Sequence, residues 1–171
     1  MKKNGLLSAL FLSSLLIACK PSDNHQHVEV MNFDNIKNWG LNGVLTEEST
    51  RSGKWATYVD STHEYSMTYE RVQQELLDKG YKKVEFTAWV KTENTDSDIK
   101  AVLTLDSPTG VNYSWQGTAI DSSITTDERG WKKVSVLLNL IKEVPEAHIK
   151  AYFWSPKKGK AIIDDVSLDF Q

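Results

Sequence analysis

Hydrophobic and polar residues alternate along most of the chain in short runs, and turn residues separate these runs roughly every eight to twelve positions. The clearest run covers residues 82–91, where Val84, Phe86, Ala88 and Val90 alternate with polar neighbours. Because successive side chains of a strand point to opposite faces, this run predicts a strand with one buried face. The repeated pattern predicts an all-β sandwich or barrel.

The pattern predicts about ten strands and at most one short helix. The predicted strands cover residues 27–33, 42–49, 54–60, 65–70, 82–91, 99–105, 111–116, 131–140, 147–154 and 161–170. Val72 and Leu76, followed by Gly80, have helical spacing and suggest a helix over residues 72–79. Two helical turns are marginal, so a crossover loop is the alternative.

The last predicted strand, 161–170, carries a carboxylate at an unusual position. Alternation predicts a core-facing set of Ile162, Asp164, Val166, Leu168 and Phe170. An ionised carboxylate among apolar side chains is costly unless a cation or several hydrogen-bond donors compensate its charge. We therefore expect a specific partner for Asp164.

The N-terminus has the composition of an export signal. Lys2 and Lys3 precede an apolar run from Leu6 to Ile17, which is too short for a membrane-spanning helix. The run ends in Leu16-Ile17-Ala18-Cys19, which resembles the lipobox of bacterial lipoproteins. We expect a signal peptide over residues 1–18, a polar tether over 19–26 and one domain over 27–171.

Cys19 is the only cysteine of the chain, so no intramolecular disulfide can form. Lipidation explains this solitary residue, and a cysteine that ends an ordinary signal by chance is the alternative. A lipidated Cys19 would anchor the domain to a membrane. We expect a location at the bacterial cell envelope, at the outer membrane, with surface exposure left open.

The charge of the mature chain argues against nucleic acid as a partner. Without Lys2 and Lys3, 18 basic and 23 acidic residues remain, a net charge of about −5. The same balance argues against acidic lipid as the natural ligand.

Catalytic motifs are absent from the sequence. The four histidines, His25, His27, His63 and His148, lie far apart without metal-ligand spacing. Asp164 and Asp165 are neighbours, which in a regular strand face opposite ways and cannot act as the acid and base of a glycosidase. We expect that the protein is not an enzyme.

Aromatic residues occur at positions that alternation assigns to the outer faces of strands. Trp89, Tyr152 and Trp154 lie opposite the core positions, and Tyr113 and Trp115 share one face of another strand. Flat rings stack on sugars while neighbouring polar groups bind the hydroxyls. The alternative is that loops or the helical segment cover these rings, since tryptophan is highly buried on average.

Several motifs in order resemble one family. They are Asn32-Phe33-Asp34 with Trp39, the segment 52–56 (Ser-Gly-Lys-Trp-Ala), Phe86 to Thr92, Gly130 to Val134, and Ile163 to Leu168. Together they resemble the carbohydrate-binding modules of bacterial xylanases and cellulases, the galactose-binding-like modules of families four, nine and twenty-two. The resemblance covers residues 28–170.

The resemblance implies a jelly-roll β-sandwich of two antiparallel sheets, often with a structural calcium ion and a sugar-binding groove on one sheet. It implies that Asp34 and backbone carbonyls near Gly53 and Lys54 join Asp164 as oxygen ligands of calcium. The alternative is that Asp164 accepts hydrogen bonds from backbone amides or hydroxyls.

Together these features favour a non-catalytic glycan-binding lipoprotein domain. Its expected ligand is a polysaccharide or oligosaccharide, bound by Trp89, Tyr113, Trp115, Tyr152 and Trp154. Such modules are usually joined to a catalytic domain, and none is present here. A structural or protein-interaction component of an envelope complex, without a sugar ligand, is therefore the alternative.

Lipidation of Cys19 is directly testable in cells. Labelled palmitate should enter the parent protein, and a Cys19→Ser variant should lose both the label and its partition with membranes, because the acyl chains supply the anchoring energy. A variant that still carries label and still sediments with membranes would exclude Cys19 as the lipidation site.

Overall fold

The computed structural model describes residues 26–36, 39–40, 44–92, 98–121 and 124–171. Cys19, the signal peptide and almost all of the predicted tether lie outside these residues. Within the described part of the chain, no helix has the length and apolar character needed to cross a membrane.

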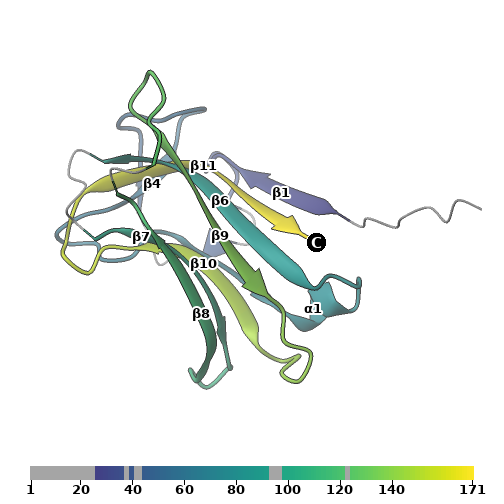
Figure 1. Ribbon diagram of the computed structural model, residues 1–171. Helices are drawn as coiled ribbons and strands as arrows, with labels where there is room; N and C mark the ends of the chain where they lie inside the picture. The colour runs from purple at the N-terminus through teal and green to yellow at the C-terminus, as the bar shows by residue number, and fades with distance from the viewer. Residues whose placement is uncertain (1–25, 37–38, 41–43, 93–97, 122–123) are drawn as a thin grey trace, which may run out of the picture.

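The fold is a sandwich of two antiparallel sheets, as the sequence predicts, and the two layers are visible in Figure 1. The first sheet has the order β3-β4-β11-β6-β9, with β1 also paired to β11, and the second has the order β2-β5-β10-β7-β8. The strands are β1 (His27–Met31), β2 (Trp39–Gly40), β3 (Leu45–Thr46), β4 (Ala56–Val59), β5 (Thr68–Val72), β6 (Lys83–Thr92), β7 (Lys100–Asp106), β8 (Asn112–Ala119), β9 (Lys132–Asn139), β10 (His148–Trp154) and β11 (Ala161–Phe170).

The core lies between the two sheets, where the alternating apolar residues of the long strands meet. The predicted inward residues of β6, among them Val84 and Phe86, are buried there. Phe86 of the first sheet meets Phe153 of the second edge to face, with ring centroids 5.7 Å apart. Packing of two such faces is the expected core of a β-sandwich.

The helical segment is shorter than predicted, because α1 covers only Gln74–Leu77. A helix of this length is not stable by itself. Its anchor is the preceding Gln73, a fully buried residue whose amide nitrogen donates to the carbonyls of Ile141 and Val144, both at 2.9 Å. The same amide accepts a hydrogen bond from the Ile141 N–H at 2.8 Å, so tertiary contacts fix this turn.

The prediction for β11 is wrong in its first half, because the strand changes face along its length. Its register against β6 shifts between Asp164 and Ser167, and Asp165 has a left-handed backbone with φ of 46°. Before this bulge Ile163 faces the core, and Ile162 instead packs outside with Ala56 and Trp131. After it Val166, Leu168 and Phe170 face the core as predicted.

Asp164 therefore lies on the outer face of the first sheet, yet it is fully buried. Its Oδ2 accepts the backbone N–H groups of Arg51 at 2.7 Å and Ser52 at 3.0 Å, and its Oδ1 accepts the N–H of Asp165 at 2.7 Å. Burial raises the pKa of Asp164, and the three hydrogen bonds oppose this rise. The carboxylate fastens the loop at residues 51 and 52 onto the sheet.

Replacement of Asp164 by alanine should destabilise the fold. The change leaves three amide groups without their acceptor in a buried place, so we expect a loss of about 2–3 kcal/mol in the free energy of unfolding. Urea denaturation measures it, with Glu143→Ala at an exposed turn position as the control. A loss no larger than that of the control would show that these bonds do not hold the loop.

Candidate functional site

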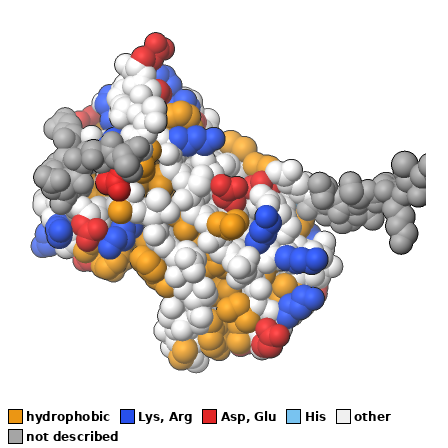
Figure 2. Space-filling view, in the orientation of Figure 1, with side chains coloured by type: hydrophobic (Ala, Val, Ile, Leu, Met, Phe, Trp, Pro, Cys, Tyr) orange, Lys and Arg blue, Asp and Glu red, His pale blue; other side chains and the backbone are white. Residues whose placement is uncertain are grey.

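The outer face of the second sheet carries a set of aromatic side chains that we call the aromatic face. Its members come from β8, β10 and the segment before β5: Tyr65, Tyr113, Trp115, Tyr152 and Trp154. Tyr65, Tyr113 and Trp115 are 49%, 38% and 42% exposed, which is high for such large rings. Figure 2 shows the side of the molecule where the edge strands β8 and β9 lie, with hydrophobic side chains gathered over the lower layer.

Strand register aligns three of these rings in a row across the sheet. Tyr152 is opposite Val102, and Val102 is opposite Gly117, so these three residues lie on the same face of the sheet. The ring of Trp115 folds over Gly117, because a Cβ atom there would lie 2.3 Å from the nearest ring carbon. Tyr65 meets Tyr152 on the other side, with ring centroids 5.8 Å apart.

The row therefore runs from Tyr65 through Tyr152 to Trp115, with the fully buried Val102 as its floor. The indole of Trp115 lies close to the Tyr152 hydroxyl and opposes the rise in the pKa of that hydroxyl. The row is an apolar surface that carries the hydroxyl groups of two tyrosines, whose rings meet edge to face.

Trp154 lies beside this row at the end of β10. It pairs with Tyr65 through an isolated bridge, and its indole N–H donates to Glu64 Oε1 at 2.8 Å. The ammonium of Lys100 lies 5.4 Å from the Trp154 ring centroid. Its ring therefore has a hydrogen bond at its edge and a cation over its face.

Polar side chains form a second row next to the aromatic one. Asp106 is its centre, because it accepts hydrogen bonds from Thr104 at 2.9 Å and from Asn112 at 2.8 Å. The Lys150 ammonium lies 3.5 Å from the same carboxylate. These groups share the outer face with Tyr152 and can bind hydroxyl groups of a ligand that rests on the rings.

Tyr152 stays protonated at neutral pH. Burial raises the pKa of its hydroxyl, and the negative charge of Asp106 and the nearby Tyr65 raise it further. Tyr152 thus offers the ligand a neutral hydroxyl.

Trp89 is not part of the aromatic face, because it lies on β6 in the other sheet, opposite Asp164. The guanidinium of Arg51 covers its ring, 3.8 Å from the centroid. The sequence could show that Trp89 faces away from the core, and it could not show which sheet β6 joins. The structure brings the other four predicted aromatic residues together on one sheet.

Sequence reasoning missed Tyr65 and Gly117. Tyr65 was placed at the start of a predicted strand without a role, and in the structure β5 begins only at Thr68. The pattern Trp115-Gln116-Gly117 was the available signal, because a glycine two positions along a strand leaves room for the neighbouring ring on the same face.

The two predicted calcium ligands both bind backbone amides. Asp34 accepts the N–H groups of Lys54 at 3.0 Å and Trp55 at 3.2 Å, and Asp164 accepts three others. In the described residues no group of three or more His, Cys, Asp or Glu side chains could hold a metal ion. Both carboxylates thus have backbone N–H groups as partners, and calcium stays a prediction of the sequence.

No protein-family model and no curated protein matches this sequence. Solved structures do resemble the fold. The CBM35 module of Cellvibrio japonicus Abf62 shares 9% identity, with 83% of this chain and 92% of that chain covered, at a TM-score of 0.53. The CBM22-1 and GH10 modules of Clostridium thermocellum xylanase 10B, solved with xylohexaose, share 17% identity, with 82% of this chain and 27% of that chain covered, at a TM-score of 0.51.

A third similar structure is the enzymatically active domain of tailspike protein 4 of bacteriophage CBA120. It shares 13% identity, with 82% of this chain and 20% of that chain covered, at a TM-score of 0.50. At these identities the likeness shows a shared fold. The chain has the β-sandwich of carbohydrate-binding modules.

Gly117 should be required for the position of the Trp115 ring. Gly117→Ala adds a methyl group where the ring lies, and the backbone at this site is not left-handed, so the ring rather than the strand should move. We expect a changed near-ultraviolet circular dichroism spectrum and greater quenching of tryptophan fluorescence by acrylamide.

The matched control is the same glycine change in a Trp115→Ala background, where the added methyl group meets no ring. If Gly117→Ala changes the spectrum equally in both backgrounds, the effect does not come from Trp115.

Proposed function

We propose that this protein is a non-catalytic glycan-binding lipoprotein domain that holds a polysaccharide at the cell envelope. The observation that carries the proposal is the aromatic face, where the exposed rings of Tyr65 and Trp115 flank the half-buried Tyr152 beside a row of hydrogen-bonded polar side chains. An apolar surface rimmed by polar groups is typical of a binding site.

The geometry suits a sugar chain. The rings of Trp115 and Tyr152 can stack on pyranose faces, and Asp106, Asn112 and Lys150 can bond the hydroxyls at the edge of each sugar. Each stacked ring should contribute on the order of 1 kcal/mol, so we expect dissociation constants of roughly micromolar to millimolar.

The similarity in fold supports this reading. The Cellvibrio japonicus structure is a carbohydrate-binding module, and the Clostridium thermocellum fragment was solved with xylohexaose. We infer the same class of ligand for this chain from its own aromatic face, since a fold alone does not fix function.

The anchor belongs to the same proposal. A lipid at Cys19 and a tether of about eight residues would hold the first strand, which starts at His27, within roughly 30 Å of the membrane surface. A glycan bound to the domain would then stay at the envelope without being cleaved.

Loss of a ring from the aromatic row should weaken glycan binding. In a glycan-array or affinity-gel screen of the soluble domain from residue 27, Trp115→Ala should reduce affinity on the order of tenfold, because it removes one stacking surface beside Tyr152. Tyr152→Ala should act in the same direction.

Trp89→Ala is the matched control, since it removes a tryptophan from the other sheet. Thermal melting should confirm that each variant is folded. A parent that binds no glycan, or a folded Trp115→Ala variant that binds like the parent, would rule out the aromatic face as a glycan site.

A further inference from the structure

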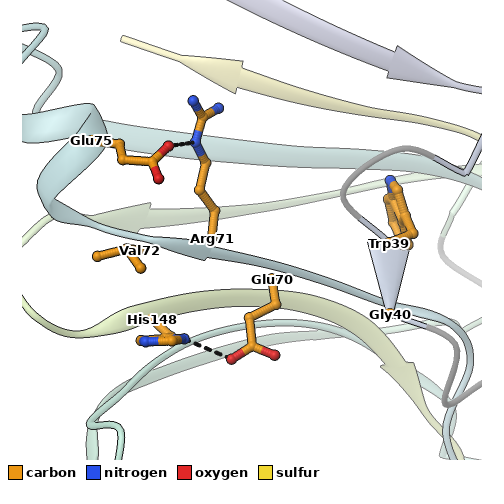
Figure 3. Close-up of a pocket in the computed structure, with 7 residues that line it drawn as sticks. All are labelled: Trp39, Gly40, Glu70, Arg71, Val72, Glu75 and His148. Carbon is orange, nitrogen blue, oxygen red and sulfur yellow. Dashed lines mark hydrogen bonds and ion pairs between the residues drawn. The ribbon is translucent and has the colours of Figure 1, made fainter.

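A second cleft lies next to the aromatic face, at the edge of β5. It has a volume of about 500 Å³, and its lining includes Trp39, Arg71, Glu75 and His148 (Figure 3). A smaller cleft of about 170 Å³ lies between Tyr65, Tyr152 and Lys150. Both clefts are also lined by Gly40 and Glu70, so they meet at these two residues.

Gly40 keeps the junction open. It pairs with Thr68 on the outer face of the sheet and has no side chain to fill the space between the clefts. In the described residues β2 pairs with β5 only at Tyr69 and Thr68, so the edge of β5 from Glu70 to Val72 borders the larger cleft. The groove can therefore continue from the aromatic rings along β5.

The only arginine of the larger cleft is already neutralised. Arg71 donates from Nη1 to Glu29 at 2.7 Å and from Nε to Glu75 at 2.9 Å, and its side chain is 16% exposed. Figure 3 shows it directed toward Glu75, on the opposite side of β5 from Glu70. This guanidinium has little capacity left to attract an acidic ligand.

The available groups of this cleft are mainly acceptors. Glu70 binds His148 Nδ1 through one carboxylate oxygen at 2.7 Å, and 48% of its side chain is exposed, so its second oxygen can accept from a ligand. Glu75 is 57% exposed at the other side of the cleft. A ligand in this cleft must donate hydrogen bonds, and a carboxylate or sulfate group would be repelled.

We propose that the larger cleft is an additional subsite of the glycan groove, which binds a neutral or amino sugar residue and rejects acidic sugars. The proposal rests on the proposed function of the aromatic face. Trp39 borders the subsite with an indole that is 8% exposed, and Glu70 at the junction contacts the hydroxyl or amino groups of the bound sugar.

The test compares the affinity of oligosaccharides that increase in length from disaccharide to hexasaccharide. The probes are xylo- and cello-oligosaccharides as neutral chains, chitosan oligosaccharides as amino chains and oligogalacturonides as acidic chains. Isothermal titration with the domain from residue 27 gives the affinities. The parent should bind long neutral or amino chains more tightly than disaccharides, and acidic chains of equal length at least about tenfold more weakly.

Two variants act on the subsite. Gly40→Leu fills the junction and should remove the gain in affinity with length, on the order of tenfold. Glu70→Gln keeps the shape of the side chain but removes its charge. It should therefore lower the affinity for chitosan oligosaccharides by a similar factor and raise the affinity for oligogalacturonides. Glu128→Gln, at an exposed loop position, is the matched control.

Glu70→Gln and folded Gly40→Leu variants that bind every probe like the parent, together with a Trp115→Ala variant that loses binding, would show that the proposed subsite is wrong. Glycan binding at the aromatic face would still be supported. Tighter binding of acidic than neutral chains would also overturn the subsite. A parent that binds no probe of any length overturns both the subsite and the proposed function.

Discussion

The bulge in β11 is the constraint on which the arrangement of the first sheet's outer face depends. β11 pairs with β1, β4 and β6, and its side chains change face where Asp165 adopts a left-handed backbone. The shift turns Asp164 outward, where its carboxylate binds the amides of Arg51 and Ser52. Side chains of the same loop, Arg51 and Ser52, bond Asp165 as well.

Because the loop at residues 51 and 52 is bound to the first sheet, it covers part of the outer face of that sheet and not the outer face of the second sheet. With its loop held down, Arg51 covers Trp89, and Ile162 is buried with Trp131 on the outer face of the first sheet. On the second sheet, by contrast, Tyr65, Tyr113 and Trp115 remain exposed. The two outer faces therefore differ in what they can bind.

The site on the second sheet is aligned by strand register. Tyr65, Tyr152 and Trp115 are far apart in the chain, and they meet because β10 pairs with β7 and β7 with β8 in a fixed register. Gly117 adds a local condition, since the Trp115 ring lies where any larger side chain would project. One extra residue in the regular part of either pairing, from Lys100 to Leu105, would turn a ring to the other face.

The sequence was sufficient for the features that depend on alternation alone. It predicted the sandwich, the core residues of β6, and the outward direction of Tyr152 and Trp154. It failed at Asp164, because a bulge breaks the period of two and its cause, the left-handed Asp165, has no local signature. It also grouped Trp89 with the other rings, since sheet membership follows from long-range pairing that periodicity does not contain.

Nuclear magnetic resonance of the indole N–H groups tests the central claim most directly. The chain has six tryptophans, so the six indole signals can be followed individually as a glycan found in the screen is added. If the aromatic face binds the glycan, the signals of Trp115 and Trp154 should shift with a common saturation curve, while those of Trp89 and Trp131 stay in place. Shifts confined to Trp89 and Trp131, with Trp115 and Trp154 unchanged, would contradict the account.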